Sequence, residues 1–123
     1  MIAYTCLGTN DLEKAGRFYD ALLGTIGAGR AMEVDGRFVA WGKAEGQPLF
    51  AMNKPFDGEA ATVGNGVMVS LGMSSRDEVD AIYKKALELG SVCEGEPGER
   101  APTFYAAYFR DLDGNKLCAC SFA

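Results

Sequence analysis

The chain has 123 residues, of which 48% are hydrophobic and 24% charged, and its formal net charge is −5. These values are typical of a single globular domain that buries a sizeable core. Its basic residues are scattered, with Lys84-Lys85 as the one adjacent pair, which argues against nucleic acid as a partner.

No apolar run approaches the length of a membrane span, and the first residues do not resemble a signal peptide. We therefore expect a cytoplasmic protein without a membrane partner. The cysteines lack CxxC spacing and are expected to be reduced, packed as small hydrophobic side chains. They are Cys6, Cys93, Cys118 and Cys120.

The first half of the chain predicts a strand, a helix and three further strands. Residues 2–9 are rich in apolar and β-branched types, and Asn10-Asp11 supplies a helix N-cap. Apolar residues then recur at helical spacing up to Leu23, and Gly24 is a suitable stop. Short apolar runs around 28–34, 37–43 and 47–52 follow, and Asp35-Gly36 indicates a hairpin.

The second half repeats this order after a linker that contains Pro55 and several glycines. A strand is expected from Val67 and a capping box at Ser75 and Glu78, before a helix that ends near Gly90. A weak strand near 91–95 precedes the clearest sheet signals. These are Thr103–Arg110, a turn at Asp111–Asn115 and a last strand, Lys116–Phe122.

The two halves are weakly repeated. A shift of 64 residues superposes Leu7-Gly8 on Leu71-Gly72, and a shift of 68 superposes Gly46 on Gly114. The pattern predicts an α+β domain over 1–123 made of two βαβββ modules, at about 1–53 and 67–123, joined by a linker at about 54–66. Paired modules favour a cleft for a small-molecule ligand.

Two segments resemble the vicinal oxygen chelate superfamily, which includes glyoxalases, bleomycin resistance proteins and extradiol dioxygenases. They are Asn10-Asp11-Leu12 before a helix with Phe18-Tyr19, and the run from Tyr108 to Leu117 around Asp111-Leu112-Asp113-Gly114-Asn115. Leu112 stands where the family usually has proline. The resemblance implies a cup-shaped mixed sheet with helices on its outer face, and a homodimer.

Metal-dependent members of this superfamily place His or Glu at four strand positions. Carried over by the resemblance and the repeat, these positions are Tyr4, Phe50, Met68 and Cys118, and the chain has no histidine. None of these side chains is a good ligand for a hard divalent ion, so we expect no metal cofactor. A soft-metal site at Cys6, Cys118 and Cys120 near Met68 is the alternative.

Strand alternation predicts which residues line the cleft. On the seventh strand, the resemblance places Tyr108 in the cleft, and Arg110 shares its parity. Trp41 has the opposite parity and is expected in the core or an interface. The predicted ligand-binding candidates are Tyr4, Cys6, Phe50, Met52, Met68, Ser70, Tyr108, Arg110, Cys118 and Cys120.

The resulting cleft is aromatic and sulfur-rich and has no evident general base. The sequence thus favours a metal-free small-molecule-binding protein of the glyoxalase/bleomycin-resistance type that sequesters an apolar or planar ligand. No catalytic residue is assigned. One alternative is a lyase or isomerase of the same fold that uses Tyr4, Tyr108, a thiol or an unusual metal. Another is an interaction protein whose cleft is filled by its own side chains.

Overall fold

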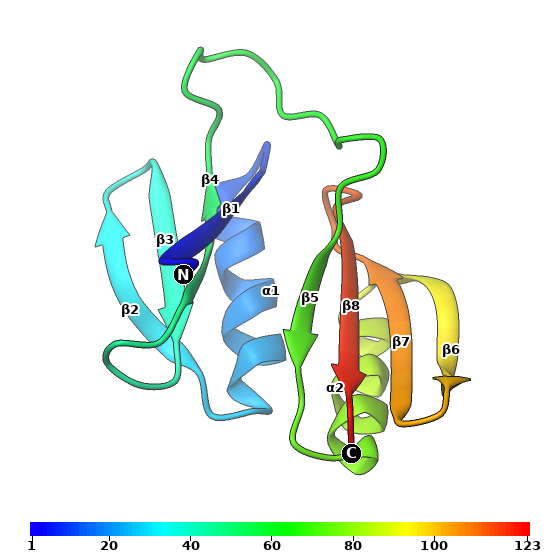
Figure 1. Ribbon diagram of the computed structural model, residues 1–123. Coiled ribbons are helices and arrows are strands. Elements are labelled where there is room, and N and C mark those ends of the chain that lie inside the picture. Colours follow the sequence, from blue (N-terminus) through cyan, green and yellow to red (C-terminus); the bar gives the residue numbers. More distant parts are fainter. The chain divides into compact units, whose positions relative to one another are not determined.

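The computed structural model describes residues 1–123 and divides into two compact units, Met1–Val63 and Gly64–Ala123. Each unit contains one four-stranded mixed sheet and one helix, in the order strand, helix and three strands (Figure 1). The predicted α+β class and the two βαβββ modules are therefore confirmed. The boundary between the units falls inside the segment expected to be a linker.

The first unit contains a sheet with the strand order β1-β4-β3-β2. Strands β1 and β4 are parallel, and the other neighbours are antiparallel. Its elements are β1 (Tyr4–Gly8), α1 (Leu12–Gly24), β2 (Gly29–Val34), β3 (Phe38–Gly42) and β4 (Leu49–Asn53).

Helix α1 begins where the sequence predicts it. The Asp11 side chain accepts a hydrogen bond from the backbone N–H of Lys14 at 3.0 Å, which satisfies one of the free donors of the first turn. The buried residues recur every three or four positions and pack against β2, β3 and β4. They are Leu12, Ala15, Gly16, Phe18, Tyr19, Leu22 and Leu23.

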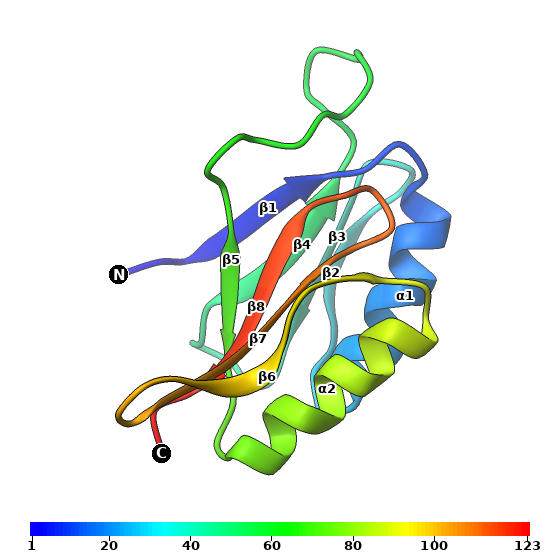
Figure 2. The same cartoon turned by 90° about the vertical axis from the view of Figure 1, so that its right-hand side faces the viewer.

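The second unit repeats this arrangement with the order β5-β8-β7-β6, in which β5 and β8 are parallel. Figure 2 shows α2 running along one face of its own sheet, where it contacts β6, β7 and β8. The elements are β5 (Val69–Gly72), α2 (Arg76–Glu88), β6 (Val92–Ala101), β7 (Phe104–Arg110) and β8 (Lys116–Ser121).

Strand β6 is longer than the weak run predicted near 91–95. It contains Pro97 and two glycines, and its pairing with β7 shifts register three times. These features are compatible with a strand here because β6 lies at the sheet edge and pairs on one side only.

The predicted capping box of α2 is present in a modified form. Ser75 Oγ accepts from the Glu78 backbone N–H at 3.1 Å. The Glu78 carboxylate accepts in turn from the backbone N–H of Ser74 at 2.7 Å, one residue before the position that the motif usually uses. Each of the two helices has 13 residues, and neither is long and apolar enough to cross a bilayer.

The predicted turn before the last strand is confirmed and is organised by a buried carboxylate. Asp111 Oδ1 accepts from the backbone N–H groups of Asp113 at 3.0 Å and Asn115 at 2.9 Å. Its Oδ2 accepts from the Asn115 side-chain amide at 3.1 Å. Gly114 adopts a φ of 94°, a conformation that favours glycine. The turn therefore fixes where β8 begins.

Candidate functional site

Each sheet has one face covered by its helix and one open face, and the strand registers assign the side chains to them. In the second unit Cys118 lies beside Ser70 on one neighbouring strand and beside Tyr108 on the other. These three residues and Cys120 thus share the open face. The opposite face carries Phe109, which is fully buried beneath α2. The predicted orientation of the β5, β7 and β8 residues is confirmed.

The open face of the first unit carries Tyr4 and Cys6 from β1, as predicted. Tyr4 is 56% exposed, and its ring meets the Phe38 ring edge to face, with centroids 6.1 Å apart. Cys6 is exposed, and its partial burial raises the pKa of the thiol. A raised pKa reduces the thiolate fraction at neutral pH and does not favour Cys6 as a nucleophile.

The expected orientation of Phe50 and Met52 is wrong. In the parallel pairing of β1 with β4, Phe50 lies beside Thr5, and Met52 lies beside Leu7. The Phe50 ring centroid is 4.7 Å from that of Tyr19 in α1, and Met52 is fully buried. Both side chains therefore belong to the helix-covered face.

The cause of this error is a repeat offset that is one residue too long. Cys6 corresponds to Ser70 by the 64-residue shift, and these two residues pair with Ala51 and Cys118 respectively. The counterpart of Cys118 is thus Ala51, at an offset of 67. Because side chains alternate along a strand, a one-residue slip reverses every face assignment. The open-face residues of β4 are Leu49, Ala51 and Asn53.

With this correction, the four superfamily positions hold Tyr4, Ala51, Met68 and Cys118. A phenol, a methyl group, a thioether and a thiol do not fit a hard divalent ion, which prefers carboxylate or imidazole ligands. Within each unit, no three His, Cys, Asp or Glu side chains gather into a metal-binding group. In the soft-metal alternative, Cys6 belongs to the first unit, whereas Cys118 and Cys120 belong to the second.

The centre of the open face in the second unit is a small apolar cluster. Cys118, Cys120 and Ala106 are buried there, and the rings of Phe104 and Tyr108 pack against them. Burial and the neighbouring Cys118 raise the pKa of the Cys120 thiol. Cysteine here acts as a compact hydrophobic residue.

Tyr108 is half-buried and has two cations beside its ring. The Arg100 guanidinium carbon lies 5.4 Å from the ring centroid, and the Lys116 ammonium lies 5.5 Å from it. The sequence analysis missed both. Lys116 shares the parity of Cys118, so alternation could have placed it on this face. Arg100 follows several register shifts of β6, which no local pattern predicts.

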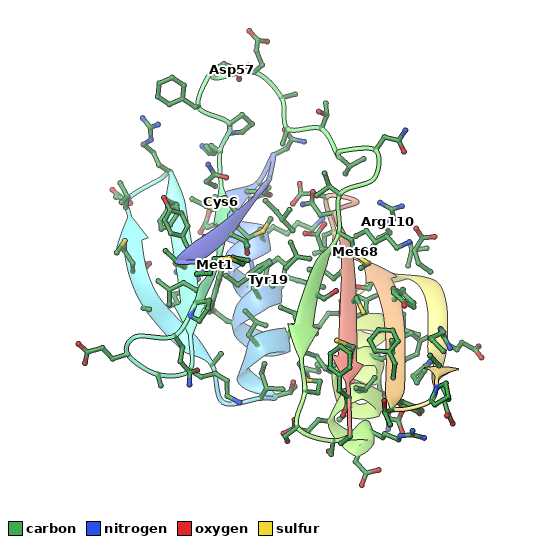
Figure 3. The ribbon with its side chains drawn as sticks, viewed as in Figure 1. Met1, Cys6, Tyr19, Asp57, Met68 and Arg110 are labelled. Carbon is green, nitrogen blue, oxygen red and sulfur yellow. The ribbon has the colours of Figure 1, made fainter.

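Arg110 and Met68 lie at the same end of the second sheet (Figure 3). Arg110 is tied to the protein: its Nε donates to Glu94 Oε1 at 2.6 Å, and Nη1 donates to the Gly114 carbonyl at 3.0 Å. Met68 directly precedes β5 and is 41% exposed. Arg110 therefore has its charge compensated by Glu94, whereas Met68 presents an exposed thioether on a flexible type of side chain.

Trp41 belongs to the core of the first unit, one of its two expected locations. It is 1% exposed, and its indole N–H donates to Asp20 at 2.9 Å. Asp20 also forms an ion pair with Arg30, whose guanidinium carbon lies 5.9 Å from the Trp41 ring centroid. The indole thus has its polar atom satisfied inside the packing of α1 on the sheet.

Two grooves of about 740 and 750 Å³ lie in the first unit. The first is bounded by the start of α1 and the β2–β3 hairpin, and charged residues of both signs line it. The second extends beside Tyr4 and Leu49, and Gly29 and Gly42 are among the residues that line it. Tyr4 is thus the one predicted ligand-binding residue that lines either of these two grooves.

The fold and the sequence identify the class of protein. The sequence model of one protein family, the Glyoxalase/Bleomycin resistance protein/Dioxygenase superfamily, matches residues 1–119. The chain belongs to this family. No curated protein sequence matches it significantly.

Solved structures agree with this family assignment. A glyoxalase/bleomycin resistance protein from Albidiferax ferrireducens T118 is 36% identical, with a TM-score of 0.87 over 98% of this chain and 97% of that one. Lactoylglutathione lyase from Agrobacterium tumefaciens is 20% identical, with a TM-score of 0.71 over 98% and 92% of the two chains. At that identity the second similarity concerns the fold alone.

Proposed function

We propose that this protein is a small-molecule-binding member of its family that holds an apolar or planar ligand on an open sheet face without a divalent metal. The observation that carries this proposal is the chemistry of the four superfamily positions: Tyr4, Ala51, Met68 and Cys118. A protein that sequesters a ligand needs a preorganised surface and no catalytic group.

The open faces have a suitable character for such a ligand. Tyr4 and Phe38 in the first unit, and Phe104 and Tyr108 in the second, supply aromatic surface. Exposed methionine adapts to ligands of different shape, as expected of Met68. Apolar lining with few polar groups is the usual composition of a small-molecule site.

Three carboxylates at helix starts, turns and sheet ends are engaged in structural roles. Asp11 caps α1, Asp111 holds the turn before β8, and Glu94 pairs with Arg110. With no histidine in the chain, acid–base chemistry near neutral pH lacks its usual residue. This distribution supports binding over catalysis.

The proposal is tested first by elemental mass spectrometry of protein purified without a histidine tag and without chelators. A tag would supply the only imidazoles in the sample. We expect a metal-to-chain ratio far below one, and planar aromatic compounds that raise the thermal midpoint. A ratio near one would contradict the proposal and direct mutagenesis to Cys118 and Cys120.

A lyase or isomerase that uses Tyr108 is the second candidate. The observation in its favour is that the Tyr108 hydroxyl forms no hydrogen bond within its unit, which leaves it available to a substrate. Tyr108→Phe distinguishes the two functions. In an enzyme it abolishes turnover and leaves the fold intact, whereas in a binding protein there is no turnover to lose and apolar ligands bind as before.

We also propose that the protein is a cytoplasmic homodimer. Strand β2 forms an edge of its sheet, and all six of its residues are exposed. Such an edge, which carries Met32 and Val34, has backbone N–H and C=O groups that can pair with a strand of another chain. Symmetric association of two copies is the common way to cover such an edge. Analytical ultracentrifugation tests this expectation, which a monomer at micromolar concentration would contradict.

A further inference from the structure

The two cations beside Tyr108, Arg100 and Lys116, lack the ion-pair partners that Arg76 and Arg110 have in the same unit. Arg110 pairs with Glu94 at 2.6 Å, and Arg76 pairs with Glu99 at 3.7 Å. Arg100 and Lys116 form no ion pair within the unit, although the chain as a whole carries a net charge of −5. Two cations without an ion-pair partner thus lie beside one tyrosine in a protein whose net charge is negative, and they offer a local attraction for an anionic group.

The position of Arg100 depends on two glycines of β6. A Cβ added at Gly95 would lie 2.9 Å from Tyr108 Cδ2 and 3.2 Å from Arg100 Nη2. A Cβ added at Gly98 would lie 2.7 Å from Arg100 Nη1. The guanidinium also donates from Nη2 to the carbonyl of Glu96. Glycine at 95 and 98 thus allows the cation and the ring to rest against the strand.

Arg100, Lys116 and the Tyr108 hydroxyl have free hydrogen-bond donors, and all three can donate to the same kind of acceptor. Arginine presents several N–H donors in a planar fork that matches carboxylate and phosphate oxygens, and lysine adds a compact positive charge. The unpaired hydroxyl of Tyr108 supplies a further donor. All three groups can donate to an oxyanion, and two of them repel a cation.

An apolar surface adjoins the cations. Cys118 and Cys120 pack with Phe104 on the same open face, and the Phe104 and Phe122 ring centroids are 5.1 Å apart. Phe122 is 73% exposed. A planar group placed on the Phe104 and Phe122 rings covers aromatic surface above the buried thiols and can extend an acidic substituent towards Tyr108.

We propose that this face binds planar organic anions, with the ring system on the Phe104 and Phe122 rings and a carboxylate or phosphate held by Arg100, Lys116 and the Tyr108 hydroxyl. The proposal rests on the proposed binding function and deepens it, because it names the ligand class as acidic. It also assigns Arg100 and Lys116 as the residues that select that class.

A set of matched probes tests the assignment on the untagged full chain. The probes are 2-naphthoate, 2-naphthyl phosphate, the neutral 2-naphthamide and the cationic 2-naphthylmethylamine, and isothermal titration calorimetry measures their affinities. We expect at least one of the two anions to bind about tenfold more tightly than the amide, since charge-assisted hydrogen bonds are the stronger ones. The preference should decrease as salt concentration rises. The two anions distinguish a carboxylate from a phosphate ligand.

Variants of the two cations make the test specific. Arg100→Gln and Lys116→Gln are each expected to weaken the preferred anion about fivefold to tenfold and to leave the amide within about twofold. Arg100→Lys should recover part of the loss because it restores the charge without the fork. The matched controls are Arg37→Gln, which removes a charge of the first unit, and Lys84→Gln, which removes one from α2; both should leave the preference unchanged. Circular dichroism confirms that each variant folds.

Equal affinity for amide and anions would overturn the proposal and leave the proposed binding function standing. Tighter binding of the amine, or an equal loss in the Arg37 and Lys84 controls, would overturn it also. So would the absence of binding by all four probes. Failure of the proposed function itself has a different signature, namely a stoichiometric metal or turnover.

Discussion

The rings of Tyr19 and Phe50 lie with their centroids 4.7 Å apart and their planes inclined by 44°. Tyr19 comes from α1, where it is fully buried, and Phe50 comes from β4. The Trp41 ring is 5.5 Å from Tyr19 and 6.4 Å from Phe50. Three aromatic side chains thus join helix and sheet in the first unit and determine which face of β4 is left open.

Replacing Phe50 by alanine is expected to destabilise the protein by about 3–4 kcal/mol, because it removes a buried ring and leaves a cavity. Urea unfolding followed by circular dichroism measures the change. Tyr4→Ala is the matched control: it removes an aromatic residue of the same sheet that is 56% exposed, and should cost less than about 1 kcal/mol. Similar losses in the two variants would contradict the assignment of faces.

Asp20 contributes stability that depends on pH. Its carboxylate accepts from Arg30 Nε at 2.8 Å, Arg30 Nη2 at 2.9 Å and the Trp41 indole at 2.9 Å. The hydrogen bonds from Arg30 hold the pKa of Asp20 below its usual value of 3.8. A folded-state pKa below the unfolded one gives stability that is present above about pH 4 and is lost as pH falls through the folded pKa.

We therefore expect Asp20→Asn to lower the free energy of unfolding at neutral pH by up to about 1 kcal/mol, a small value because 44% of the carboxylate side chain is exposed. The difference from the wild type should shrink as pH falls below about 4. Urea unfolding at a series of pH values measures this. Asp35→Asn, on the hairpin turn, serves as the control. A difference that grows in acid would refute the predicted sign.

The buried carboxylate of Asp111 is expected to contribute more to the stability of the fold than a carboxylate in an exposed loop does. Asp111→Ala leaves the backbone N–H groups of Asp113 and Asn115 without this acceptor and should cost about 2–3 kcal/mol. Asp57, which accepts from the Glu59 backbone N–H at 2.9 Å in an exposed loop, is the control, with an expected cost below about 0.5 kcal/mol for Asp57→Ala. The denaturant midpoints of the two variants give the comparison.

The parts of the fold that the sequence predicts are those specified by local chemistry. Asp11 and Ser75 mark helix starts because their side chains accept from the first turn, whatever the rest of the chain does. Asp111 and Gly114 likewise specify a turn within five residues. The family resemblance depends on these same segments and is confirmed.

The parts that the sequence does not predict depend on register between distant strands. The orientation of Phe50 follows from its pairing with Thr5 in β1, a contact that no local pattern encodes. Arg100 reaches Tyr108 because β6 shifts register around Gly95 and Gly98. The orientation of the candidate residues was therefore predicted correctly on β8 and incorrectly on β4, and Arg100 of β6 was not predicted.

Tyr83 provides a spectroscopic test of the contact between α2 and β6. A hydrogen bond with Cys93, partial burial and the negative charges of Cys93 and Glu96 raise the pKa of Tyr83 to about 12. The hydrogen bond to Asp80 also raises the pKa of Tyr105, so the titration uses the Tyr105→Phe background. In an ultraviolet titration of its phenols, one tyrosine should ionise late, and Cys93→Ala should return it towards the ordinary value of about 10. Cys6→Ala removes a thiol of the first unit and should leave the curve unchanged. A late transition that persists without Cys93 would show that this thiol is not the cause.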